Sequence, residues 1–269
     1  MGRPSAEIGV IGGSGLYQLF EGAEPVGLTT PWGAPSAPPA VGELGGRPVA
    51  FIPRHGPHHE HPPHRINYRA NLWALSQLGV RQVLAPCASG SLQPHVHPGE
   101  VVICDQLVDR TWGRPDTFHD GGAAVHVSFA DPYCPALRQA LAEAAGRVGL
   151  VAHPSGTVVV VQGPRFSTRA ESAWFRSQGW QVVNMTQYPE AVLARELGMC
   201  YAAAALVTDY DAGLEGDASV APVTMDAAFE VLGSLAGSTR RLLAEAVATL
   251  GPQGDSGCSC RQLGGPGAG

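Results

Sequence analysis

The 269-residue chain has few charged residues and no long apolar run. Charged residues make up 15% of the sequence and hydrophobic residues 44%, a balance that excludes an intrinsically disordered chain. Because no stretch of about 20 apolar residues occurs, we expect no membrane-spanning helix and no membrane partner. Residues 1–5 lack the apolar core of a signal peptide, which favours a cytoplasmic location.

Basic residues are also scarce. The 23 acidic residues outnumber the 17 basic ones and give a net charge of −6. A duplex-binding protein usually presents a basic face, so nucleic acid is not expected as a partner, although a local basic pocket could hold a small anion. Six cysteines are present, mostly in apolar surroundings that suit buried thiols, and a disulfide framework is not expected in a cytoplasmic enzyme of this length.

The apolar pattern predicts an α/β domain. Continuous apolar runs predict strands at residues 7–11, 48–52, 80–85, 100–103, 157–161, 182–183 and 199–207. Helical spacing predicts helices at residues 67–78, 135–148, 167–176, 190–197 and 223–250. This alternation is typical of one central sheet flanked by helices. We expect a single domain over residues 1–250 and a flexible tail, rich in glycine, proline and serine, over residues 251–269.

Polar loops follow several of these strands, where open α/β sheets bind ligands. Gly12-Gly13-Ser14-Gly15 can approach an oxyanion through backbone N–H groups and the Ser14 hydroxyl, or can form a plain strand-to-helix turn. Arg54 and His55 could donate to a phosphate, and a structural salt bridge of Arg54 is the alternative interpretation. Small residues predict a loop at 87–91, and residues 184–186 end another strand.

Five of the ten histidines lie between residues 55 and 64. Such a cluster raises the hypothesis of a metal site. Two prolines interrupt it, however, no H-E-x-x-H motif occurs, and no cysteine lies nearby in the sequence. We therefore interpret the cluster as a polar loop with one or two functional histidines, and we expect no metal.

Asp209 and Asp211 follow a fully apolar strand. If the strand continued, both side chains would lie on one side of it. Burying two carboxylates is costly unless they serve a function. One can hold a proton while the other stays ionised, which suits protonation of a ring nitrogen and acceptance from an exocyclic amine. The alternative is a pair of turn or helix-capping aspartates.

Eight short motifs occur in order along the chain: GGSG at 12–15, TPWG at 30–33, RHG at 54–56, NYRAN at 67–71, DQLVDRT at 105–111, QGPRFS at 162–167, NMT at 184–186 and TDYD at 208–211. Together they resemble the 5′-methylthioadenosine phosphorylases, a trimeric branch of the purine nucleoside phosphorylase family. The resemblance runs from about residue 7 to residue 250. It implies a single-domain purine nucleoside phosphorylase-like fold with a mixed central sheet.

The resemblance also implies reversible phosphorolysis. Inorganic phosphate attacks C1′ of a nucleoside with inversion and releases adenine and a 5-modified ribose 1-phosphate, through a transition state that resembles an oxocarbenium ion. No organic cofactor and no metal is implied, because phosphate is a co-substrate. The implied assembly is a homotrimer, alone or paired into a hexamer.

By position, the resemblance assigns phosphate binding to Ser14, Arg54, His55, Cys87, Ala88 and Thr186. It assigns purine and ribose binding to Ser89, Gly90, Phe166, Ser167, Asn184 and Met185. Asp209 is the expected acid at purine N7, and Asp211 the expected acceptor from the 6-amino group. The pocket for the 5′ substituent is expected from Met225, Ala228 and Phe229 on the last helix, and from His126 of a neighbouring subunit.

The aspartate pair favours adenine, because a carboxylate accepts from a 6-amino group and repels a 6-oxo group unless it is protonated. Relatives that take 6-oxopurines carry Asn at the position of Asp209. A site built around such a hydrogen bond can discriminate by up to about four or five orders of magnitude. A 6-oxopurine or 5′-methylthioinosine phosphorylase and a 5′-deoxy-5′-haloadenosine phosphorylase stay open as alternatives. A non-catalytic purine-binding or metal-binding module and a nicotinamide dehydrogenase are disfavoured, the latter because G-x-G-x-x-G is absent at Gly12.

Three positions depart from the pattern of the relatives. Cys87 stands where a threonine commonly donates to phosphate, so phosphate binding is expected to be weaker or to depend on the backbone. Gln162 stands where some relatives have Glu, which removes a charge near the pocket. Cys258-Ser259-Cys260 resembles a C-x-C pair of some heat-stable members, and its role, redox or otherwise, stays open.

Overall fold

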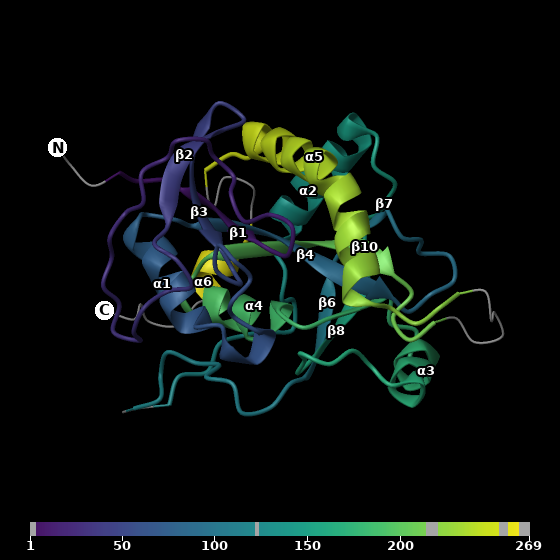
Figure 1. Ribbon diagram of the computed structural model, residues 1–269. Coiled ribbons are helices and arrows are strands. Elements are labelled where there is room, and N and C mark those ends of the chain that lie inside the picture. Colours follow the sequence, from purple (N-terminus) through teal and green to yellow (C-terminus); the bar gives the residue numbers. More distant parts are fainter. Residues whose placement is uncertain (1–3, 122–123, 214–219, 253–257, 264–269) are drawn as a thin grey trace.

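The computed structural model describes residues 4–121, 124–213, 220–252 and 258–263. In this part of the chain ten strands form one mixed sheet with helices on both faces (Figure 1), which confirms the predicted fold class. The strands are β1 (Ile8–Gly12), β2 (Ala40–Leu44), β3 (Arg47–Pro53), β4 (Gln82–Ser91), β5 (Val101–Ile103), β6 (Gln106–Arg110), β7 (Ala152–His153), β8 (Thr157–Val161), β9 (Val182–Asn184) and β10 (Cys200–Asp209). The helices are α1 (Tyr68–Gln77), α2 (Pro135–Val148), α3 (Arg169–Ser177), α4 (Gln187–Glu196), α5 (Met225–Thr249) and α6 (Cys260–Leu263), with a 3₁₀ turn η1 (Pro63–Arg65).

The main path of the sheet runs β2-β3-β1-β4-β10-β5-β7. Its centre is parallel: Val10 of β1 lies between Phe51 of β3 and Leu84 of β4, and Tyr201 of β10 lies beside Val83 of β4. The strands β2 and β5 pair antiparallel with β3 and β10. Because β3, β1, β4 and β10 are parallel, their carboxyl ends meet at one edge of the sheet, where ligands bind in this class of fold.

The strand β4 is longer than the sequence predicts. Residues 87–91, which we expected to form a loop, continue the strand: Cys87 pairs with Ala205, and Gly90 pairs with both Asp209 and Val183. Small residues are typical of loops, but here they let β4 run between closely packed neighbours. Its last residues leave the main sheet and pair with β9, which leads to a second arm formed by β8 and β6.

Apolar cores cover both faces of the sheet (Figure 1). On one face α1 and α4 bury side chains such as Leu72 and Leu193. On the other face α2 and α5 pack against each other and bury side chains such as Leu141 and Leu242. Each helix has the apolar stripe that the 3.6-residue period predicted.

Differences from the predicted elements lie mainly at the margins. The strands β2 and β6 are only partly buried, so they lack the apolar runs by which the central strands were recognised. The helix α3 begins after Thr168, whose side chain accepts from the Glu171 N–H while the Glu171 carboxylate accepts from the Thr168 N–H, a capping box. No helix in the described ranges combines the length and apolar character that crossing a bilayer would need.

Candidate active site

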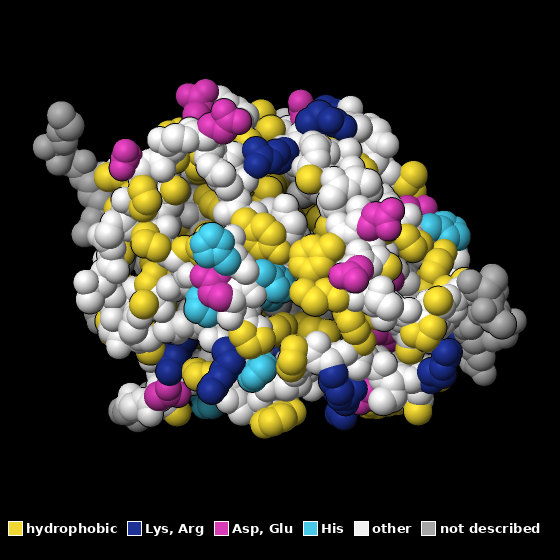
Figure 2. All heavy atoms as spheres, viewed as in Figure 1, with side chains coloured by type: hydrophobic (Ala, Val, Ile, Leu, Met, Phe, Trp, Pro, Cys, Tyr) yellow, Lys and Arg dark blue, Asp and Glu magenta, His cyan; other side chains and the backbone are white. Residues whose placement is uncertain are grey.

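A cavity of about 320 Å³ opens at the carboxyl ends of the central strands, a volume within the range of small-molecule sites. Histidine and hydrophobic side chains gather near the centre of the face shown in Figure 2. The cavity lining brings together all but one of the expected site residues: Ser14, Arg54, His55, Cys87, Ala88, Ser89, Gly90, Phe166, Ser167, Asn184, Met185, Thr186, Asp209, Asp211, Met225, Ala228 and Phe229. The exception is His126, which is exposed and lies outside the lining of its own chain's cavity.

Two carboxylates meet at the end of β10. The Thr208 hydroxyl donates to Asp209 Oδ2 at 2.5 Å, and the Asp211 backbone N–H donates to Asp209 Oδ1 at 2.7 Å. Asp211 Oδ2 is buried and accepts no hydrogen bond from the described residues. Because buried acceptors are normally satisfied, this oxygen can accept from a donor on a ligand or from the nearby hydroxyls of Ser167 and Ser172, which are also unpartnered among the described residues.

The strand does not continue through Asp211, so the condition for strand alternation is not met and the alternative interpretation, a turn, describes the backbone here. Its register with β4 shifts between Val207 and Asp209, and Asp211 has a φ of 49°, in the left-handed region. The two carboxylates therefore meet through a tight turn and not through strand alternation. Aspartate tolerates this backbone conformation better than most residues, and such conformations are common at functional sites.

Burial raises the pKa of both aspartates. For Asp209 burial outweighs the hydrogen bonds from Thr208 and from the Asp211 N–H, and the neighbouring Asp211 carboxylate raises the pKa further. For Asp211 burial outweighs the opposing effect of the nearby Ser172 and Ser167 hydroxyls. A carboxyl group that keeps its proton to a higher pH is suited to act as a general acid.

Two glycines allow the strand ends to approach each other closely. A Cβ on Gly90 would lie 2.8 Å from Asp209 Oδ1 and 3.2 Å from the Asp211 Cβ. A Cβ on Gly13 would lie 2.7 Å from the Pro86 carbonyl oxygen and 3.0 Å from an Arg54 nitrogen. Larger residues at these positions would displace the side chains that line the cavity.

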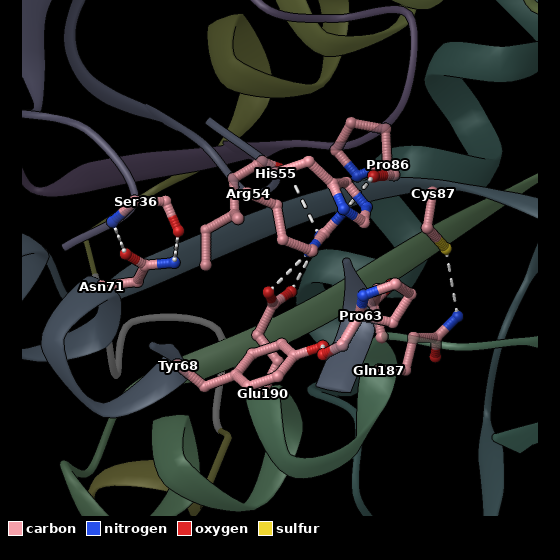
Figure 3. Close-up of polar contacts among 12 residues, drawn as sticks. Ser36, Arg54, His55, Pro63, Tyr68, Asn71, Pro86, Cys87, Gln187 and Glu190 are labelled. Carbon is pink, nitrogen blue, oxygen red and sulfur yellow. Dashed lines mark hydrogen bonds and ion pairs between the residues drawn. The ribbon is translucent and has the colours of Figure 1, made fainter. Parts of the chain in front are cut away.

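Arg54 forms a buried ion pair at the base of the cavity (Figure 3). Its Nε and Nη2 donate to the two Glu190 oxygens at 2.7 and 2.8 Å, and its Nη1 and Nη2 donate to the carbonyls of Pro86 and Ile11. Although burial alone would lower the pKa of Arg54, the Glu190 carboxylate raises it, so the guanidinium is permanently charged. The structural salt bridge, our alternative interpretation of Arg54, is therefore present, and one N–H on Nη1 has no partner among the described residues.

His55 is neutral in its buried position. Burial lowers its pKa to about 3, and its Nδ1 lies 2.9 Å from the His61 carbonyl oxygen, to which it donates. We infer from this hydrogen bond that Nε2 carries no proton. His55 thus offers an acceptor to the cavity, in place of the donor that the sequence suggested.

The Cys87 thiol is held by two side-chain amides. Asn184 Nδ2 and Gln187 Nε2 each donate to its sulfur at 3.3 Å. The thiol itself donates to the Ala204 carbonyl oxygen, which lies 3.8 Å from the sulfur. Burial raises the pKa of this thiol, so it stays protonated at neutral pH. A phosphate would therefore compete with the Ala204 carbonyl for the S–H.

Comparisons with known proteins show the family to which the chain belongs. Residues 7–247 match the Phosphorylase superfamily. The chain belongs to this superfamily. It is 62% identical over 224 residues to an S-methyl-5′-thioadenosine phosphorylase of Mycolicibacterium smegmatis, covering 83% of this chain and 84% of the relative. It is 50% identical over 266 residues to a purine nucleoside phosphorylase of Streptomyces coelicolor, covering 96% and 94%. The structure superposes on the methylthioadenosine phosphorylase of Schistosoma mansoni in complex with adenine, with a TM-score of 0.86, 37% identity and 91% coverage of both chains.

Some cavity residues of this superfamily member were missed by the sequence analysis. His59 lines the cavity, where it stacks on His55 at 4.6 Å, meets Phe229 edge-on at 5.6 Å, and hydrogen-bonds the Tyr17 hydroxyl. The histidine cluster was a signal for it, but the sequence could not tell which members face the cavity. Thr208 also lines the cavity, within a motif we had read for its aspartates alone.

Arg114 supports the cavity wall from a stretch that has no regular pattern in the sequence. It donates to the backbone carbonyls of Met185 at 2.9 Å and Tyr188 at 2.6 Å, and to the side-chain oxygen of Gln162 at 3.2 Å. Gln162 itself does not line the cavity. The presence of Gln162 where some relatives have Glu therefore changes the hydrogen bond with Arg114 and not the lining of the cavity.

Proposed function

We propose that the chain cleaves the N-glycosidic bond of 5′-methylthioadenosine, or of a related 5′-modified adenosine, with inorganic phosphate as the attacking group. The products are adenine and the 5-modified ribose 1-phosphate. The observation that carries the proposal is the pair formed by the partly buried Asp209 and the buried Asp211, which lines the same cavity as the glycine loop at Ser14. The sequence identity to a methylthioadenosine phosphorylase supports it.

At the purine, we assign the acid role to Asp209 and the acceptor role to Asp211. The C1′–N9 bond breaks with its electron pair moving into the purine, and the proton of Asp209 neutralises the base at N7. The unsatisfied Asp211 Oδ2 accepts from the 6-amino group. A 6-oxo group would place an acceptor against this oxygen, which gives the site its preference for adenine.

At the sugar, phosphate attacks C1′ from the face opposite the base. We assign its binding to the hydroxyls of Ser14 and Thr186, the backbone of Ala88 and the remaining N–H of Arg54. The unprotonated Nε2 of His55 can accept a hydrogen bond from the P–OH group of hydrogen phosphate, which orients the attacking oxygen. Most of the catalysis comes from holding phosphate on one face of the sugar and the Asp209 acid beside the purine. We propose that no organic cofactor or metal takes part in these steps.

The 5′ substituent is assigned to Met225, Ala228 and Phe229 at the start of α5. Met225 is 52% exposed, so this side of the cavity is open in a single chain. We propose that the protein works as a homotrimer, or as a pair of trimers, in the cytoplasm, and that His126 of one subunit closes the 5′ side of the next. Light scattering should give the mass of a trimer or hexamer, and His126→Ala should raise the KM for methylthioadenosine about 10-fold with little change in the KM for phosphate. A monomer of full activity would refute this assembly.

A 6-oxopurine phosphorylase is the second candidate, supported by the relative of 50% identity that is named a purine nucleoside phosphorylase. The test is base release with and without phosphate from 5′-methylthioadenosine, 5′-methylthioinosine, inosine and a 5′-deoxy-5′-haloadenosine. We expect fast, phosphate-dependent release from methylthioadenosine. Preference for the inosine substrates would overturn the roles of the aspartates, and release without phosphate would overturn phosphorolysis itself. A preference for the halogenated nucleoside would keep the chemistry and change the 5′ substituent.

A further inference from the structure

Four cysteine side chains from distant parts of the sequence meet at the other end of β10 from the active site. Cys200 begins β10, Cys134 precedes α2, and Cys258 and Cys260 belong to the C-terminal segment. All four Sγ atoms lie within 4.8 Å of one another, and those of Cys200 and Cys258 are 3.4 Å apart. Cys134, Cys200 and Cys260 are buried, and Cys258 is half-buried.

This spacing fits a tetrahedral metal centre. Zinc–thiolate bonds are about 2.3 Å long, so the sulfurs of a tetrahedral tetrathiolate are about 3.8 Å apart. A covalent disulfide needs sulfurs about 2.05 Å apart. The four sulfurs thus already surround a point from which a zinc ion could reach all of them with small side-chain movements. We propose that Cys134, Cys200, Cys258 and Cys260 bind one structural zinc ion.

The surroundings can compensate the charge of such a centre, which is −2 for zinc and four thiolates. Arg195 on α4 is buried, and its guanidinium donates at 2.7 Å to the carbonyl of Asp131, three residues before Cys134. Cys134 is the N-cap residue of the 14-residue helix α2, so the positive end of the helix dipole lies beside the proposed centre.

The zinc would be structural and not catalytic. Cys200 and Asp209 lie nine residues apart on one extended strand, which separates the cluster from the cavity by about 30 Å. The site would fasten the C-terminal segment to the domain: α6 packs against α4, and the Arg261 carbonyl oxygen would lie 3.5 Å from a Cβ on Gly198. The sequence alone does not indicate this cluster, because Cys134 and Cys200 meet only in the folded chain.

The test is elemental analysis of the full chain, purified under reducing conditions without chelator. We expect about one zinc per chain in the natural protein and less than a tenth of that in a Cys258→Ser/Cys260→Ser double variant. A Cys104→Ser variant, which removes a buried thiol outside the cluster, should keep its zinc. After the zinc is removed, cobalt(II) should give the visible and near-ultraviolet bands of a tetrahedral thiolate site in the natural protein.

The cobalt spectrum keeps the proposal falsifiable if the double variant fails to fold. Absence of zinc together with absence of thiolate–cobalt bands would overturn the proposal. Zinc bound equally by the double variant would place the metal elsewhere and would also overturn it. If thiol titration and intact mass show two disulfides that persist in the reduced preparation, the four cysteines form disulfide cross-links and the zinc assignment is wrong.

Discussion

Asp209→Asn is the substitution that most directly tests the chemistry. Asparagine has nearly the same shape, and its Oδ1 can still accept the Asp211 N–H that now lies 2.7 Å from Asp209 Oδ1. The Thr208 hydroxyl, which donates to Oδ2, can turn toward the Ser89 carbonyl oxygen at 3.4 Å and accept from the new amide. We therefore expect the variant to fold and to lose less than about 1 kcal/mol of stability.

The loss of activity should be much larger than the loss of stability. General acid catalysis contributes about 10²- to 10⁴-fold, or about 3–5 kcal/mol of the barrier, and an amide cannot supply the proton for purine N7. Turnover of 5′-methylthioadenosine should fall by that factor. Turnover of 5′-methylthioinosine should fall less, because purine O6 lies beside N7, so a side-chain amide at position 209 can also donate to a 6-oxo group. One such hydrogen bond, about 1 kcal/mol, changes the ratio of the two rates by about fivefold.

The assay is kcat/KM for both nucleosides at saturating phosphate, with the thermal midpoint measured beside it. The control is Asp226→Asn, an exposed aspartate in the first turn of α5 that does not line the cavity. A kcat within threefold of the natural protein would remove the acid role from Asp209. An unchanged ratio between the two nucleosides would refute its part in base selection.

Four further outcomes are expected. Arg54→Met should lower the free energy of unfolding, measured with denaturant, by about 3–5 kcal/mol because it leaves Glu190 charged and buried. Adding Glu190→Leu should restore most of this stability. If the losses of the two substitutions add instead, the argument that the two side chains form a stabilising pair is refuted. Gly90→Ala should lower kcat about 10- to 100-fold with a small change in KM for phosphate, because its Cβ would displace the Asp209 carboxylate; unchanged kcat would contradict this geometry. Cys87→Thr should lower the KM for phosphate about fivefold, since a hydroxyl is the better donor, and a raised KM would show that the thiol only fills space. Because burial raises the pKa of Asp209, its carboxyl group keeps its proton to a higher pH than an ordinary aspartate. We therefore expect kcat to fall as the pH rises through that raised pKa. The pH profile of the Asp209→Asn variant should lack this fall.

The sequence predicted the centre of the fold better than its margins. Strands such as β1 and β10 are buried on both faces, so they form unbroken apolar runs. The partly buried β6 has no such pattern, because polar residues flank its few apolar ones. The small residues at 87–91 gave the wrong prediction because their role depends on neighbours that the sequence does not show.

The same limit applies to the site. Residues of the loops after β1, β3 and β10 could be expected to meet, because these parallel strands end at one edge, whereas β9 runs antiparallel to β4 and its position could not be expected. The side chains that those residues bind could not be predicted. Glu190, which binds Arg54, lies 136 residues away from it in the sequence. The sequence alone therefore could not indicate whether the arginine faces a ligand or another side chain. The turn that places Asp211 in a left-handed conformation was equally hidden, because aspartate is compatible with both a strand end and a turn.

The buried ion pair explains how a chain with so few charged residues can keep an anion site. An unpaired buried guanidinium would cost several kcal/mol, whereas Arg54 bound to Glu190 stays charged at little net cost when no phosphate is present. Glu190 in turn accepts from the Tyr201 hydroxyl at 2.8 Å, so its carboxylate is well satisfied. The pair adds almost no net charge to the cavity floor, so attraction for phosphate must come from oriented hydrogen-bond donors and the loop backbone. This makes phosphate binding sensitive to the identity of single donors, which is why one thiol in place of a hydroxyl at position 87 should be measurable.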